Sequence, residues 1–203
     1  MKKVLIALVL PLLASSLAEA QEKGEYKRWK LDFTRGEFAN VFVTDALGKT
    51  HVSWYLTFSV KNGHDRDVPL GLRVLGSTDT KQEYRGTIAP QFQSALEKKT
   101  GRKYKSALDL SKGTIAAGET VEGVVFFGNV DPNMDWMTIR VYGLYDTIEQ
   151  IDGKLYFEQR VLVLTYYRPG DEFGAAGDEI HFKRSDWVIE GERVEIPQKK
   201  PWQ

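Results

Sequence analysis

The chain has 203 residues, no cysteine, and 28 basic against 28 acidic side chains, so its formal net charge at pH 7 is zero. The absence of cysteine excludes disulfides, thiolate catalysis and cysteine-ligated metal sites. The charge balance gives no overall attraction to nucleic acid or to anionic membranes, so we expect neither as a partner.

The first 20 residues have the pattern of a bacterial signal peptide. Lys2 and Lys3 precede an apolar stretch over residues 4–13, and residues 18–20 read AEA, a cleavage pattern. The stretch is shorter than the roughly 20 apolar residues of a spanning helix, which disfavours the alternatives of an uncleaved anchor or a buried N-terminal helix. No cysteine follows it, which argues against a lipid anchor. Cleavage after Ala20 leaves 26 basic and 27 acidic side chains, and we expect a periplasmic or secreted protein that does not span the membrane.

Alternation of apolar and polar residues, the period of a half-buried strand, recurs along the chain. It predicts strands at residues 29–33, 41–43, 51–61, 68–74, 120–127, 137–144 and 155–167. Pairs of turn-forming residues, Asn-Gly at 62–63 and Asp-Gly at 152–153, interrupt the pattern. Pro69 and Gly71 suit a strand at a sheet edge. In the last strand both faces become apolar around Leu162, which indicates either burial on both sides or a bulge.

One helix is expected within the long segment 76–119. Pro90 suits its first position, and Gly101 suits the position after its end. The sequence therefore predicts a mostly β fold, an antiparallel immunoglobulin-like β-sandwich over residues 21–168, with one short helix in a long inter-strand connection.

The C-terminal part has a different character. Residues 169–178 are rich in glycine and predict a loop. Residues 179–197 predict one or two short strands, in the same domain or as an arm, with a turn at 190–192. The tail 198–203 is expected to be disordered.

Three segments carry a resemblance to a known family. Residues 54–62 read WYLTFSVKN, residues 113–127 read GTIAAGETVEGVVFF, and residues 137–144 read MTIRVYGL. Over residues 38–144 this arrangement resembles the immunoglobulin-like, telokin-like sandwiches of bacterial secreted proteins. The resemblance implies a core position for Ile115, a tight turn at 117–119 and a location in the cell envelope. It transfers no catalytic residue.

Two acidic turns are candidate metal sites. His64, Asp65 and Asp67 place an imidazole and two carboxylates close together, ligand types that suit zinc or calcium. The alternative is a plain turn, in which aspartate is common for backbone reasons. The loop with acidic pairs at 171–172 and 178–179 lacks the residue order of a calcium-binding loop, so a solvated loop is favoured there.

A basic cluster and a set of tyrosines are candidate binding surfaces. The cluster could meet an anionic partner, or it could be the solvated end of the predicted helix; it consists of Lys98, Lys99, Arg102, Lys103 and Lys105. The tyrosines could form a sugar- or peptide-binding platform, or belong to the core; they are Tyr55, Tyr142, Tyr145, Tyr156, Tyr166 and Tyr167.

No catalytic residue can be named. The sequence has 3 histidines and no G-x-S-x-G motif. We therefore predict a non-catalytic binding or interaction module of the cell envelope without a cofactor, whose partner is a protein or an envelope polymer. Its binding edge is predicted near Pro69 and Gly71. The alternatives are a periplasmic metal- or small-ligand-binding protein and a cell-wall hydrolase.

Overall fold

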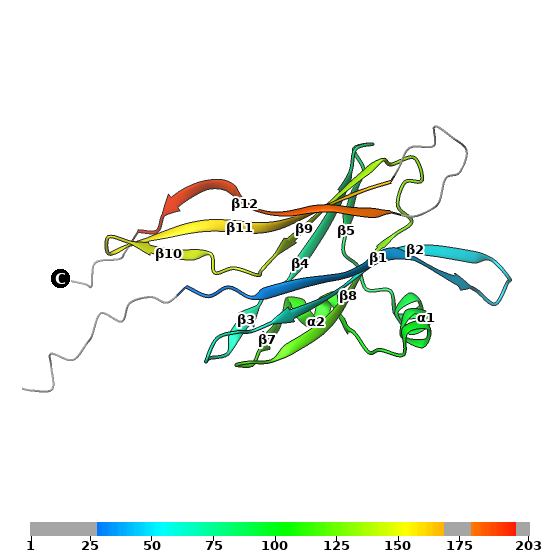
Figure 1. The fold of residues 1–203 in the computed structure, drawn as a ribbon, viewed down its shortest axis with the longest axis horizontal. Coiled ribbons are helices and arrows are strands. Elements are labelled where there is room, and N and C mark those ends of the chain that lie inside the picture. Colours follow the sequence, from blue (N-terminus) through cyan, green and yellow to red (C-terminus); the bar gives the residue numbers. More distant parts are fainter. Residues whose placement is uncertain (1–27, 169–179, 198–203) are drawn as a thin grey trace, which may run out of the picture.

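The computed structural model describes residues 28–168 and 180–197. Two mostly antiparallel sheets form two layers, with the helices α1 (Pro90–Thr100) and α2 (Ala107–Ser111) at one side of the assembly (Figure 1). Within the described ranges, no helix combines the length and apolar character needed to cross a membrane. The predicted signal peptide, the loop 169–178 and the tail 198–203 lie outside the described residues.

The first sheet has four strands in the order β1-β2-β8-β6. They are β1 (Asp32–Thr44), β2 (Thr50–Lys61), β8 (Thr120–Gly128) and β6 (Lys105–Ser106). The expected strands at 29–33 and 41–43 are one strand, β1, which has an irregular register between Arg35 and Phe38. The short β6 pairs parallel to β8, so the fold is not entirely antiparallel.

The second sheet has six strands, in the order β10-β11-β9-β4-β5, with β12 on the other edge of β11. They are β4 (Arg73–Thr78), β5 (Glu83–Arg85), β9 (Trp136–Tyr142), β10 (Ile148–Ile151), β11 (Lys154–Tyr167) and β12 (His181–Glu195). The predicted turn at 152–153 joins β10 to β11, and both of its residues have positive φ, as such a hairpin requires. Val161 and Leu162 are both buried and the register with β9 is unbroken, so burial on both faces explains the apolar run in β11.

Two expectations about strands are wrong. The segment 68–74 divides into β3 (Val68–Leu70), which pairs with β7 (Gly113–Ile115), and β4, which lies between β9 and β5. Pro69 does lie in an edge strand, because among the described residues β3 pairs only with β7, but this strand has 3 residues and Gly71 lies outside it. The predicted turn at 190–192 is absent, because β12 continues through it and pairs with β11 on both sides of Gly191.

The predicted helix is α1 (Pro90–Thr100), and Gly101 ends it in the left-handed conformation with φ of 69°. A second helix was not expected. It is α2 (Ala107–Ser111), which starts with a capping box between Ser106 and Asp109. The short length of α2 leaves little helical periodicity in the sequence to detect.

Two apolar clusters hold the fold together. The main cluster lies between the sheets, where Phe38 of β1 contacts Tyr166 of β11 with ring centroids 4.6 Å apart. The second cluster lies under α1, where Phe92 and Leu96 pack on the outer face of the first sheet, beside Phe126. That strand face is therefore covered rather than available to a partner.

Candidate functional site

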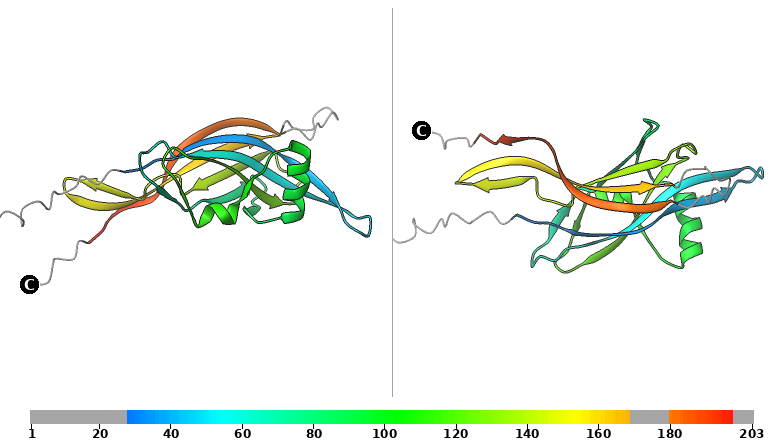
Figure 2. Two further views of the ribbon diagram at one scale, coloured as in Figure 1. Left: turned by 90° about the horizontal axis from the view of Figure 1, so that it is seen from below. Right: turned by 45° about the horizontal axis from the view of Figure 1, so that its top comes forward.

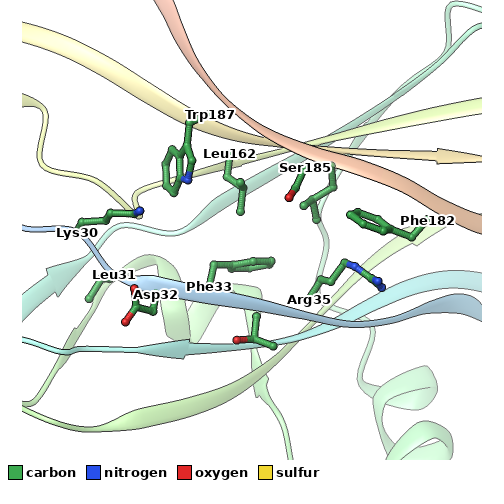
Figure 3. Close-up of a pocket in the computed structure, with 11 residues that line it drawn as sticks. Lys30, Leu31, Asp32, Phe33, Arg35, Leu162, Phe182, Ser185 and Trp187 are labelled. Atoms are coloured by element: carbon green, nitrogen blue, oxygen red, sulfur yellow. The ribbon is translucent and has the colours of Figure 1, made fainter.

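A cleft of about 400 Å³ opens between the first half of β1 and strand β12. Figure 3 shows side chains from the two strands projecting toward each other across it. The two strands are the outermost members of different sheets, and Figure 2 shows them running along the same side of the molecule. The cleft is thus the open side of the two-layer fold.

The floor of the cleft is apolar. Leu31 is fully buried, and Leu162 and Leu164 of β11 are also buried below the opening. Phe33 lines the same floor and stacks on Phe58 of β2, with ring centroids 5.3 Å apart. Leu31, just before β1, and Phe33 are two positions apart, as are Leu162 and Leu164 of β11, so each pair lies on one face of its chain segment.

A pair of a cation and an aromatic ring links the two strands at each end of the cleft. The Arg35 guanidinium lies 3.7 Å from the ring centroid of Phe182, and Lys30 Nζ lies 5.1 Å from that of Trp187. The contacts step five residues forward along β1 and five residues back along β12, so the strands run antiparallel to each other. Such pairs contribute about 0.5–1 kcal/mol each at exposed positions.

Both strands present a free backbone edge. Among the described residues, β1 pairs only with β2 over its 13 residues, and β12 pairs only with β11 over its 15 residues. In a strand with one neighbour, alternate residues direct N–H and C=O groups away from that neighbour. The described free edges of β5, β6 and β10 are much shorter, at 3, 2 and 4 residues.

The segment just before β1 is held against the chain that follows β9, at one end of the cleft. Leu31 N–H donates to the Leu144 carbonyl at 2.9 Å, and Asp146 N–H donates to the Trp29 carbonyl at 3.0 Å. His64 adds to this, because its Nε2 accepts a hydrogen bond from Lys30 N–H at 3.1 Å. The cleft therefore has one closed end, and its two walls are held at a defined separation there.

The charged side chains that line the cleft are Lys30, Asp32 and Arg35, so the formal charge of the lining is plus one.

Tyr166, a buried neighbour of the cleft, has an unusual environment. The Tyr166 ring packs edge-on against Phe182, and its buried hydroxyl has no hydrogen-bond partner among the described residues. Burial raises the pKa of Tyr166 to about 12, so this hydroxyl stays protonated at neutral pH.

Two of the three candidate metal residues, His64 and Asp67, bond to the backbone, and the third, Asp65, is exposed. His64 contacts Lys30, and Asp67 accepts a hydrogen bond from Ala117 N–H at 3.1 Å. Throughout the described ranges, no three His, Asp or Glu side chains are placed to hold a metal ion. The structure thus gives the metal hypothesis no support, and the acidic pairs at 171–172 and 178–179 lie outside the described residues.

The basic cluster is partly used in local ion pairs. Lys103 Nζ lies 2.6 Å from Glu97, and Lys105 Nζ lies 3.8 Å from Glu119. Glu97 also accepts hydrogen bonds, and Lys103 together with Gln93 and the Tyr104 backbone lowers its pKa to about 2. The remaining members, Lys98, Lys99 and Arg102, are exposed around the end of α1.

The six tyrosines do not form one platform. Tyr55 and Tyr166 are in the core, and Tyr142 is buried on the outer face of the second sheet, below the Arg73 guanidinium. The guanidinium groups of Arg28 and Arg160 lie 4.6 and 4.9 Å from the centroid of the Tyr145 ring. Cations therefore cover part of both the Tyr142 and the Tyr145 ring.

Sequence reasoning missed Arg35, Phe182, Ser185 and Trp187 as site residues. Phe182, Ser185 and Trp187 of β12 line the cleft, but they do not keep a spacing of two residues, because the register with β11 is irregular beside Phe182. The available cue for an edge, proline or glycine, pointed to Pro69 and Gly71 instead. Comparison with protein-family models, with curated proteins and with solved structures found no match to this chain.

Proposed function

We propose that this protein is an exported interaction module of a bacterial cell envelope, and that it binds an extended segment of a partner polypeptide in the cleft between β1 and β12. One observation carries the proposal: two long, free strand edges flank an apolar floor. A peptide in the cleft adds a strand to one of these edges and places alternate side chains on the floor.

A polypeptide fits this cleft better than an envelope polysaccharide does. A strand edge offers backbone donors and acceptors at a regular repeat of about 3.4 Å per residue, which only another polypeptide backbone matches. The aromatic rings at the two ends, Phe182 and Trp187, already contact the cations of Arg35 and Lys30, so these ring faces are not free to stack on a sugar. Lys30 and Arg35 are five positions apart, so a bound segment that spans them has about six residues, over roughly 17 Å.

The charge of the lining favours a particular kind of peptide. With Lys30 and Arg35 at the two ends and Asp32 between them, the ends attract carboxylates and the middle does not. The partner segment is therefore apolar at every second residue and flanked by acidic residues. The proposal includes a location in the cell envelope, which the signal-peptide pattern supports. It also includes an immunoglobulin-like type of sandwich, which the two-layer β fold without cysteine supports.

The test starts with selection of a phage-displayed library of random octapeptides on the purified protein. We expect enriched peptides with alternating apolar residues and acidic ends. The best peptide is then resynthesised with N-methyl groups at alternate backbone nitrogens, which removes donors and leaves the side chains unchanged. Binding should weaken at least tenfold if the peptide pairs with a strand edge.

Two matched variants locate the site. Ser185 lines the cleft, whereas its neighbour Asp186 is on the opposite face of β12. Ser185→Trp should block the selected peptide, and Asp186→Trp should leave its affinity unchanged. If the library yields no peptide that depends on Ser185, or if N-methylation has no effect, strand addition in this cleft is rejected.

A further inference from the structure

A second and larger cavity lies at the opposite margin of the sheets and shares no lining residue with the cleft. Its volume is about 810 Å³, and its walls are the first half of β4, the segment 85–88 and helix α2. Small-molecule sites of proteins typically have volumes of about 300–1,000 Å³. The cavity is therefore large enough for a ligand.

The walls of this cavity are fixed by the fold. Gly86 N–H donates to the Val74 carbonyl at 2.9 Å, and Thr87 N–H donates to the Phe126 carbonyl at 2.8 Å, so the segment crosses from one sheet to the other. A Cβ atom on Gly86 would lie 2.3 Å from a methyl group of Val125, which shows how closely this segment packs. The opposite wall is held by the buried Leu110 of α2.

Two large aliphatic side chains line the cavity and remain open to water. Ile88 is 47% exposed and Leu108 is 46% exposed, and Leu75 and Ala107 extend the same apolar wall. Exposed aliphatic side chains that converge on a concave surface are typical of a binding site, because a ligand that covers them recovers the hydrophobic free energy.

The ionisable side chains that line the cavity are both arginines, Arg73 and Arg85. Among the described residues, neither makes an ion pair with a carboxylate. Arg73 is positioned by Tyr142, whose ring centroid lies 4.1 Å from its guanidinium. The planar fork of a guanidinium matches the two oxygens of a carboxylate.

We propose that this cavity binds a free fatty acid of medium chain length, with its carboxylate at Arg73 and Arg85 and its chain against Ile88 and Leu108. The apolar wall selects an aliphatic body, and the two unopposed cations select an anionic head. The inference does not depend on peptide binding, because the two sites have different walls and different ligands.

The test titrates the purified protein with decanoate below its micelle concentration and follows backbone amide signals by NMR. We expect saturable shifts at Ile88 and Leu108. Decanol has the same chain without the charge, and decyltrimethylammonium has the opposite charge; both should bind at least tenfold more weakly. Tighter binding of decyl phosphate would overturn the assignment of the head group.

Paired variants separate the two parts of the site. Arg85→Gln should weaken decanoate about tenfold, whereas Arg102→Gln, on an exposed arginine after α1, should not. Leu108→Asp should also weaken decanoate binding about tenfold. Its control is Leu47→Asp, on a side chain that is 93% exposed in the β1–β2 turn, which should leave the binding of decanoate unchanged. Circular dichroism confirms that each variant is folded. No saturable binding of decanoate, or equal affinities in all four variants, would overturn the proposal.

Discussion

Glu158 shows how much one residue can contribute to this fold. Its side chain is 1% exposed and receives hydrogen bonds from Arg28, Arg160 and Arg193, and Glu149 forms further ion pairs with two of these arginines. Burial alone would raise the pKa of Glu158, but hydrogen bonds from the three arginines outweigh it and hold the pKa at about 2. The cluster joins β10, β11, β12 and the segment before β1.

We expect Glu158→Gln to lower the free energy of unfolding at pH 7 by about 2 kcal/mol, because it leaves three arginines around a neutral side chain. A folded pKa below the ordinary value of 4.5 stabilises the protein above pH 4.5, and this contribution is lost as the pH falls toward 2. The difference between wild type and variant should therefore shrink over that range in urea titrations. Glu122→Gln, at an exposed position, serves as the control, and its free energy of unfolding should differ little from that of the wild type at every pH. A difference for Glu158→Gln that stays constant with pH would contradict the lowered pKa of Glu158.

Gly143 illustrates a second effect at the scale of one residue, the closeness of two backbones. Gly143 and Gly48 both have φ of 79°, a conformation that costs other residues about 1–2 kcal/mol. A Cβ atom on Gly143 would lie 2.3 Å from the Gly71 carbonyl oxygen, whereas one on Gly48 would have no neighbour within 4 Å. We expect Gly48→Ala to cost about 1 kcal/mol and Gly143→Ala about 3 kcal/mol or more in denaturant unfolding. Equal losses would mean that the contact with Gly71 can relax freely.

At the scale of the element, local signals predicted those parts of the fold whose causes are local. Pro90 and Gly101 delimit α1, and the Asp-Gly pair at 152–153 makes the β10–β11 hairpin. Strand character at residues 179–197 is also predicted from the sequence, but the continuity of β12 is not. Gly191 has φ of 82°, which favours a turn, yet pairing with β11 continues on both sides of it, and the extra residues form an irregularity in the register.

The candidate cleft was beyond sequence reasoning for a related reason. Alternation indicates which residues of a regular strand share a face, but it does not tell which strands are neighbours in space, and in β12 the irregular register beside Phe182 breaks it. The two walls lie about 150 positions apart in the chain, and the contacts of Arg35 with Phe182 and of Lys30 with Trp187 exist only after the sheets have packed. Pro69 and Gly71 predicted a sheet edge within one strand, whereas the structure divides that segment into β3 and β4 and places Pro69 in the short edge strand β3.

At the scale of the whole molecule, the main apolar cluster takes residues from both sheets, so we expect the sheets to unfold together. Phe38 of β1 contacts Phe127 of its own sheet and Tyr166 of the other, which couples the two layers. Small domains with one such core usually unfold in a single cooperative step.

Native-state hydrogen exchange with increasing urea can test this coupling. The slowest amides of β2 and β9, strands of different sheets, should show the same opening free energy and the same dependence on urea, because both exchange only through global unfolding. The amides of β10 should open at lower free energy, since none of its four residues is buried. Different values for β2 and β9 would mean that the sheets separate before either unfolds. In that case the cleft between β1 and β12 would widen in a populated open state, and a peptide would have to close it on binding. Equal opening free energies for β2 and β9 would mean that the cleft is a preformed site, whose walls stay in place as long as the protein is folded.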